Sequence, residues 1–88
     1  MTHELKTWTE YYESLEKGIK TFELRKDDRP FAALDTLIAQ EWDNIKKEYT
    51  GKEISFIITY ILRDCPEFGL KKGYVILGIQ PKREPEDC

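Results

Sequence analysis

The sequence predicts one α+β domain, in which a single N-terminal helix packs against a closed or nearly closed β-barrel of five to six strands. One early segment has apolar residues at helical spacing, and four later segments have the alternation or the apolar runs of strands. A small sheet with apolar faces must protect its edges, and closure into a barrel removes those edges. The chain of 88 residues fits one domain, which we place at residues 1–80, followed by a charged tail at 81–88.

The composition excludes several classes of protein. Hydrophobic residues make up 40% of the chain and charged residues 35%, which is typical of a globular rather than a disordered sequence. Cys65 and Cys88 do not make a disulfide framework, so we expect reduced thiols and a cytoplasmic location. The apolar stretch Phe56–Leu62 is much shorter than the ~20 residues of a membrane-spanning helix. We therefore expect no membrane association.

Residues that hold metals or cofactors are scarce. His3 is the single histidine, and the two cysteines do not add the spacing of a zinc site. The five glycines are scattered and form no phosphate-binding loop. We expect no metal and no cofactor.

The N-terminal part predicts a short strand at 3–6 and a helix at roughly 8–17. Thr7 and Glu10 have the spacing of a capping box, and Gly18 follows the helix where a left-handed residue is expected. The apolar face of this helix is expected to contain Trp8, Tyr11, Tyr12, Leu15 and Ile19.

Four further strands are predicted at 21–26, 36–42, 52–62 and 74–79. In the first, Phe22 and Leu24 are expected to face the core, while Glu23 and Arg25 share the opposite face with Thr21. The strand at 52–62 has apolar residues on both faces and is expected to be central. The residues expected to be largely buried are Phe22, Leu24, Phe56, Ile58, Tyr60, Val75 and Leu77.

The segment 17–29 is the most basic of a chain whose net charge is −3. It contains Lys20, Glu23 and Arg25, spaced as Gly-x-Lys-x-x-Glu-x-Arg from Gly18. Cations on this face can bind phosphate or carbonyl oxygens, and a carboxylate can accept from an amine or orient the arginine. The simpler interpretation is a solvated strand face with a Glu23–Arg25 ion pair worth ~0–1 kcal/mol.

This octapeptide resembles the signature of ASCH domains, a branch of the PUA-like superfamily. The resemblance continues through Gln40-Glu41-Trp42, Tyr49-Thr50-Gly51, Phe68-Gly69-Leu70 and Gly73-Tyr74-Val75-Ile76-Leu77-Gly78. It is strongest to a small ASCH-like family of unknown function that is common in phages and bacteria. One position departs from that family, because Leu34 precedes Asp35 where a glycine is usual. The resemblance implies a PUA-like barrel with an RNA-binding cleft beside the helix, lined by the signature residues.

Three functions remain open from the sequence. The first is an RNA- or nucleotide-binding module, with Lys20 and Arg25 on a phosphate or base edge and Glu23 on an amino group. In this interpretation Trp42 and Tyr74 are possible stacking residues. The second is a hydrolase acting on RNA or a modified nucleoside, with Lys20 and Glu23 as catalytic groups. Some ASCH relatives are hydrolases of this kind, but they have a threonine where Glu23 stands. The third is a protein-interaction module of phage origin.

Overall fold

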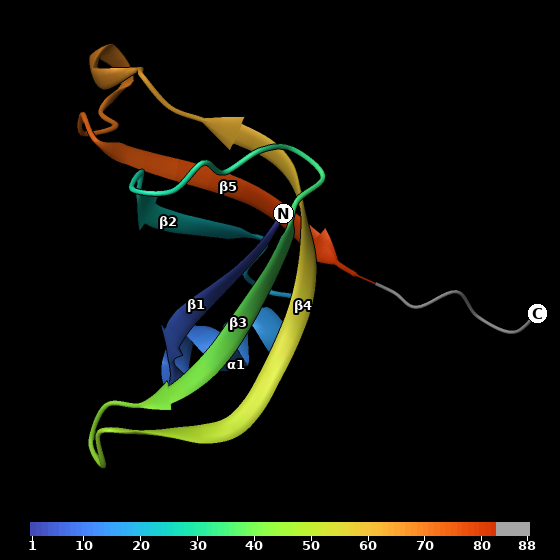
Figure 1. Ribbon diagram of the computed structural model, residues 1–88. Coiled ribbons are helices and arrows are strands. Elements are labelled where there is room, and N and C mark those ends of the chain that lie inside the picture. Colours follow the sequence, from blue (N-terminus) through green and yellow to red (C-terminus); the bar gives the residue numbers. More distant parts are fainter. Residues whose placement is uncertain (83–88) are drawn as a thin grey trace, which may run out of the picture.

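The computed structural model describes residues 1–82, so Cys88 and most of the predicted tail lie outside the described residues. Five strands, one α-helix and one short 3-10 helix follow each other along this part of the chain (Figure 1). In chain order they are β1 (Thr2–Trp8), α1 (Thr9–Glu16), β2 (Phe22–Lys26), β3 (Thr36–Asp43), β4 (Glu48–Leu62), η1 (Pro66–Phe68) and β5 (Tyr74–Pro81).

The five strands form one curved sheet in the order β1-β3-β4-β5-β2. Only β1 and β3 are parallel, and the other neighbours are antiparallel. The sheet curls into a half-barrel, as the C-shaped ribbon in Figure 1 shows. The predicted strand number is therefore confirmed, but the barrel is open, because the edge strands β1 and β2 do not pair with each other. The long strand β4 is central, as predicted.

The core lies on the inner face of the curved sheet, where α1 covers it. Alternate residues of β1, β3, β4 and β5 point inward, and the short helix contributes one tyrosine and one leucine. Each large side chain that is fully buried contributes roughly 1.5–3 kcal/mol. The buried cluster consists of Leu5, Tyr12, Leu15, Phe31, Leu37, Ala39, Phe56, Ile58, Val75, Leu77 and Ile79.

The helix is found within one residue of its predicted ends, but the predicted capping box is wrong. Thr7 belongs to β1, and its hydroxyl donates to the Leu5 carbonyl oxygen instead of capping the helix. The N-cap residue is Trp8, which makes no side-chain capping bond. Gly18 has φ of 76°, which confirms the predicted left-handed residue after the helix.

Only part of the predicted helical face is buried. Tyr12 and Leu15 reach the core, whereas Trp8, Tyr11 and Ile19 are exposed. Eight residues make about two turns. Such a helix presents few inward positions, so the longer apolar pattern overestimated its buried face.

The faces of β2 are inverted relative to the prediction. Phe22 and Leu24 were expected in the core, but they are 47% and 54% exposed. Glu23 points inward instead and is only 2% exposed. A buried carboxylate is tolerated when cations and hydrogen-bond donors satisfy it, and Lys20 and Arg25 do so here. The alternation of this strand was predicted correctly, and the choice of inner face was wrong.

The end of β4 also departs from simple alternation. Ile58 pairs with Ile79 and Tyr60 pairs with Gly78, so Thr59 is an extra residue in the ladder. Such a bulge reverses the side chains that follow it. Tyr60 is consequently 67% exposed, and Ile61 packs against the core in its place. The predicted burial is confirmed for Phe56, Ile58, Val75 and Leu77 and is wrong for Tyr60.

The loop before β3 is held by Asp35. Its carboxylate lies 2.8 Å from His3 Nε2 and accepts from the Met1 amino group at 3.1 Å and the Ala32 amide at 3.1 Å. The hydrogen bond from His3, followed by that from the amino group, lowers the pKa of Asp35 from 3.8 to about 2. The preceding residue, Leu34, has φ of 75°, and its amide donates to the Ile58 carbonyl. A leucine therefore makes this backbone turn without a glycine.

Candidate functional site

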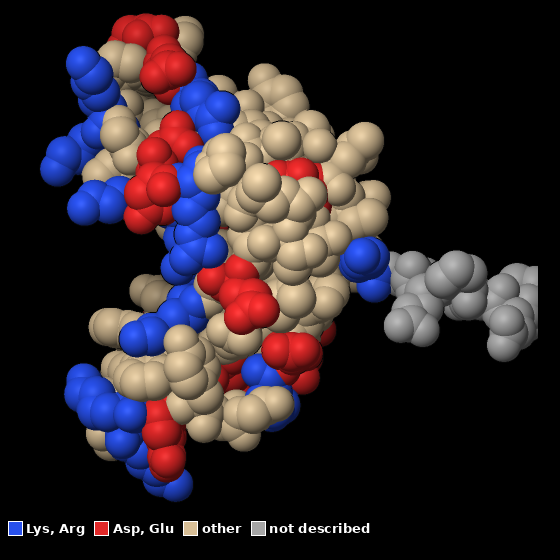
Figure 2. Space-filling view, viewed as in Figure 1, with Lys and Arg blue, Asp and Glu red and all other residues tan. Residues whose placement is uncertain are grey.

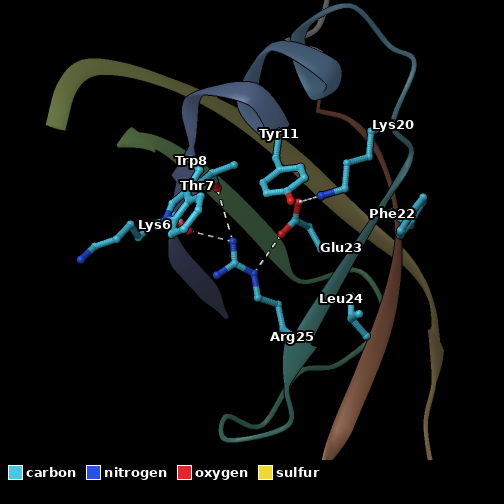
Figure 3. Close-up of a pocket in the computed structure, with 9 residues that line it drawn as sticks. All are labelled: Lys6, Thr7, Trp8, Tyr11, Lys20, Phe22, Glu23, Leu24 and Arg25. Atoms are coloured by element: carbon cyan, nitrogen blue, oxygen red, sulfur yellow. Dashed lines mark hydrogen bonds and ion pairs between the residues drawn. The ribbon is translucent and has the colours of Figure 1, made fainter. Parts of the chain in front are cut away.

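A cleft opens where the two edges of the half-barrel face each other. It lies between β2, the C-terminal end of β1 and the first turn of α1, and its volume is about 560 Å³. Figure 2 shows the surface hollowed on its left side, with Lys and Arg side chains on the rim. The lining residues, drawn in Figure 3, are Lys6, Thr7, Trp8, Tyr11, Lys20, Phe22, Glu23, Leu24 and Arg25.

The three predicted site residues converge in this cleft (Figure 3). Glu23 Oε1 accepts from Lys20 Nζ at 3.0 Å, and Glu23 Oε2 accepts from Arg25 Nε at 2.9 Å. The Glu23 side chain is 3% exposed, whereas those of Lys20 and Arg25 remain partly open to solvent. Two cations around one carboxylate leave the group with an excess of one positive charge. Because both oxygens of Glu23 are occupied, its carboxylate orients the two cations.

Arg25 also connects the two edges of the sheet. Its Nη2 donates to the Lys6 carbonyl oxygen at 2.9 Å and to Thr7 Oγ1 at 3.4 Å. Arg29 makes a similar contact further along, from Nη1 to the Glu4 carbonyl oxygen at 2.9 Å. These side chains replace the missing backbone pairing between β1 and β2. The planar, multidentate guanidinium group suits this use, because one side chain can bind several acceptors.

Aromatic side chains form the walls of the cleft. Lys20 Nζ lies 4.9 Å from the ring centroid of Tyr11 and 5.6 Å from that of Phe22, within the range of cation–π attraction. Trp8 and Tyr11 are each 48% exposed. Trp8, Tyr11 and Phe22 were not predicted as site residues, because their spacing predicted burial in the core. For Trp8 and Tyr11 the signal was an apolar stripe at helical spacing that is wider than a helix of eight residues can bury.

The two predicted stacking residues lie outside this cleft. Trp42, on β3, makes an edge-to-face contact with Tyr49 at a centroid distance of 4.8 Å. Tyr74 begins β5, and its ring centroid lies 5.7 Å from Lys71 Nζ. Neither residue is among those that line the cleft. The structure thus brings Lys20, Glu23 and Arg25 together and leaves Trp42 and Tyr74 apart from them.

The cleft is lined by three cations, one carboxylate, two hydroxyl groups and aromatic rings. Among residues 1–82, no three His, Cys, Asp or Glu side chains are grouped so that they could hold a metal ion. None of the helices in the described part of the chain is long and apolar enough to cross a membrane. Anions and planar rings are the ligands that fit such a lining.

Two comparisons relate the chain to other proteins. A protein of Escherichia phage P2, called "Uncharacterized 12.9 kDa protein in GpA 3'region", is 37% identical over 57 residues. The match covers 65% of this chain and 50% of the phage protein, so it spans only half the length of that relative. A family model described as a domain of unknown function, DUF3850, matches residues 2–79 and thus nearly all of the described chain. The chain belongs to this DUF3850 family.

Proposed function

We propose that this protein is an RNA- or nucleotide-binding module of the ASCH type, within the PUA-like superfamily, and that it acts in the cytoplasm. One observation carries the proposal: Lys20, Glu23 and Arg25 converge at the floor of an open cleft with aromatic walls. Cations supply affinity for phosphate groups, and exposed rings stack bases with little regard to sequence. The combination supports a nucleotide as the ligand better than either feature would alone.

Lys20 is the main contact for phosphate in this proposal. Its Nζ makes one bond to Glu23 and lies beside two rings, and the ammonium has further donors available. Arg25 contributes charge, while part of its guanidinium group already binds the Lys6 carbonyl. Glu23 is better suited to orienting these cations than to reading an amino group, because each of its oxygens already accepts a bond.

The ligand is expected to be short. The whole chain carries a net charge of −3, which opposes binding of a long polyanion. A cleft of about 560 Å³ lies within the usual size of sites for small molecules. These two facts favour a mononucleotide or a short single strand over duplex RNA.

Fluorescence anisotropy with a labelled single-stranded oligouridylate tests the proposal. Neutralising one phosphate on single-stranded nucleic acid contributes about −0.7 to the slope of log affinity against log salt. Lys20→Ala should therefore weaken binding and make the slope shallower by about 0.7. Lys26→Ala, an exposed lysine on the same strand as Arg25, is the matched control and should change affinity little. Equal effects of the two variants would refute a specific site at Lys20.

The hydrolase alternative is tested on the same samples. Mass spectrometry of the RNA and of a panel of modified nucleosides after incubation would reveal any product. Turnover that Lys20→Ala abolishes would replace the binding proposal with an enzymatic one. The Glu23 carboxylate is buried and bound by both Lys20 and Arg25, which argues against its use as a general acid or base. If the protein shows neither turnover nor salt-sensitive RNA binding, both proposals fail and the protein-interaction module is the remaining function.

A further inference from the structure

A row of three aromatic residues, two exposed and one half-buried, crosses the outer face of the sheet next to the cleft. Trp8 on β1 is the register partner of Trp42 on β3, and Trp42 is the register partner of Tyr49 on β4. All three lie on the face that does not point into the core. Trp8 also lines the cleft, so the row begins at the cleft and runs across three strands. We call these residues the aromatic row.

Lys6 joins the aromatic row to the cleft. It lines the cleft, and its Nζ lies 4.0 Å from the ring centroid of Trp42 and 6.0 Å from that of Tyr49. A phosphate that binds this ammonium group would therefore sit at the boundary between the two surfaces. Nucleotides on either side of that phosphate could then reach the cleft and the row, respectively.

The surface beyond Tyr49 continues as a second hollow of about 390 Å³. Its wall includes Tyr49, Gly51 and Lys52, with Glu4 and Glu53 among the other lining residues. The turn that follows β3 adds exposed Lys46 and Lys47. Figure 2 shows Lys and Arg side chains at this hairpin, at the lower left. Cations thus occur at both ends of the row. The acidic side chains of the second hollow would repel phosphate groups, so the phosphates are expected to lie on the Lys6 side.

We propose that the aromatic row is a second base-binding subsite for single-stranded RNA whose first nucleotide occupies the cleft. This inference rests on the proposed function of the cleft and extends the bound strand beyond it. Tyr49 is about half exposed, so part of its ring is accessible to a base. Trp42 supports that ring by its edge-to-face contact, and Lys6 binds the connecting phosphate. Continuity with the cleft and the adjacent lysine favour RNA over an apolar protein partner as the occupant.

Binding of uridine monophosphate and of a uridine tetranucleotide should separate the two subsites. Tyr49→Ala should weaken tetranucleotide binding about 5- to 150-fold, the fold-change that corresponds to stacking on one aromatic ring, and should leave mononucleotide binding unchanged. Lys20→Ala should weaken both. The matched control is Tyr60→Ala, a tyrosine on the same strand β4 that is 67% exposed and lies outside the row. It should change neither affinity.

A fluorescence measurement supports the test independently of Tyr49. Trp8 and Trp42 are the two tryptophans of the chain, so Trp8→Phe leaves Trp42 as the single indole emitter. Its emission should change with the tetranucleotide and stay constant with the mononucleotide. If the tetranucleotide binds no tighter than the mononucleotide, or if Tyr49→Ala and the Trp42 emission do not respond, the second subsite is refuted while the cleft proposal stands. If neither ligand binds, both proposals fail.

Discussion

Arg25 Nη2 lies 2.9 Å from the backbone carbonyl oxygen of Lys6, so a side chain of β2 takes the hydrogen-bonding position that a neighbouring strand would fill. The same guanidinium group binds Glu23 through Nε. One residue therefore ties the open edge of β1 to β2 and also forms the floor of the cleft. The shape of the site and the closure of the half-barrel depend on the same side chain.

Arg25→Lys should destabilise the fold although it keeps the charge. An ammonium group lacks the planar fork and cannot reproduce the bonds to Glu23, Lys6 and Thr7 together. We expect the free energy of unfolding to fall by about 1–3 kcal/mol, the usual value for hydrogen bonds to charged groups. Urea denaturation measures this change. Lys26→Ala, an exposed residue on the same strand, serves as control, and an equally large effect there would contradict the assignment.

Glu23→Gln should also destabilise the protein. The amide removes the negative charge between Lys20 and Arg25, and its NH₂ group faces one of the two donors. A buried group left without its partner costs about 1–3 kcal/mol of unfolding free energy. Since the cations are partly open to solvent, water offsets some of this loss. Denaturant unfolding checks the result against Glu67→Gln, an exposed glutamate in η1. A stability equal to that of the wild type would show that Glu23 does not organise the cluster.

The sequence predicted the element order and part of the barrel core, because periodicity and apolar runs mark the strands. Apolar runs identified β4 and β5 and the burial of Val75 and Leu77. The pattern did not show which face of β2 points inward. The alternation of apolar and polar residues contains no information on the cations that satisfy the buried Glu23. The bulge at Thr59 was missed for a related reason. An extra residue in a ladder is defined by the partner strand and not by the local sequence.

The candidate site was only half visible in the sequence. Its charged residues were predicted because Lys20, Glu23 and Arg25 are close in the chain, and the last two share one face of a strand with a polar neighbour. Its walls were missed, because aromatic residues in amphipathic segments are ordinarily assigned to the core. Trp8 shows the difficulty, since it lies on the rim because it ends β1 and α1 begins only at Thr9. The position of these aromatic residues depends on pairing between distant strands, which the local sequence pattern does not show.

Leu34→Gly should stabilise the protein. Leu34 has φ of 75°, and a left-handed conformation costs an L-residue roughly 1–2 kcal/mol. Its side chain is largely exposed, so little packing is lost with it. The greater backbone freedom of glycine in the unfolded chain offsets about 1 kcal/mol of the gain. We expect a net increase in unfolding free energy of up to about 1 kcal/mol. A thermal unfolding scan would show a raised midpoint, whereas Leu34→Ala, which keeps the strain, should not raise it.

Asp35 should make the fold sensitive to acid. Hydrogen bonds from His3 and the amino terminus lower its folded pKa from 3.8 to about 2. A lowered folded pKa means that the stabilisation is complete above 3.8 and is lost as the pH falls through about 2. Urea midpoints measured across this range should fall for the wild type and fall less steeply for Asp35→Asn. Asp43→Asn is the control, because Asp43 also has a lowered pKa, caused by the Lys46 and Ile45 amides. The urea midpoint of the Asp43→Asn variant should still fall with pH because Asp35 is intact. Parallel profiles for the wild type and Asp35→Asn would contradict the assignment of this carboxylate.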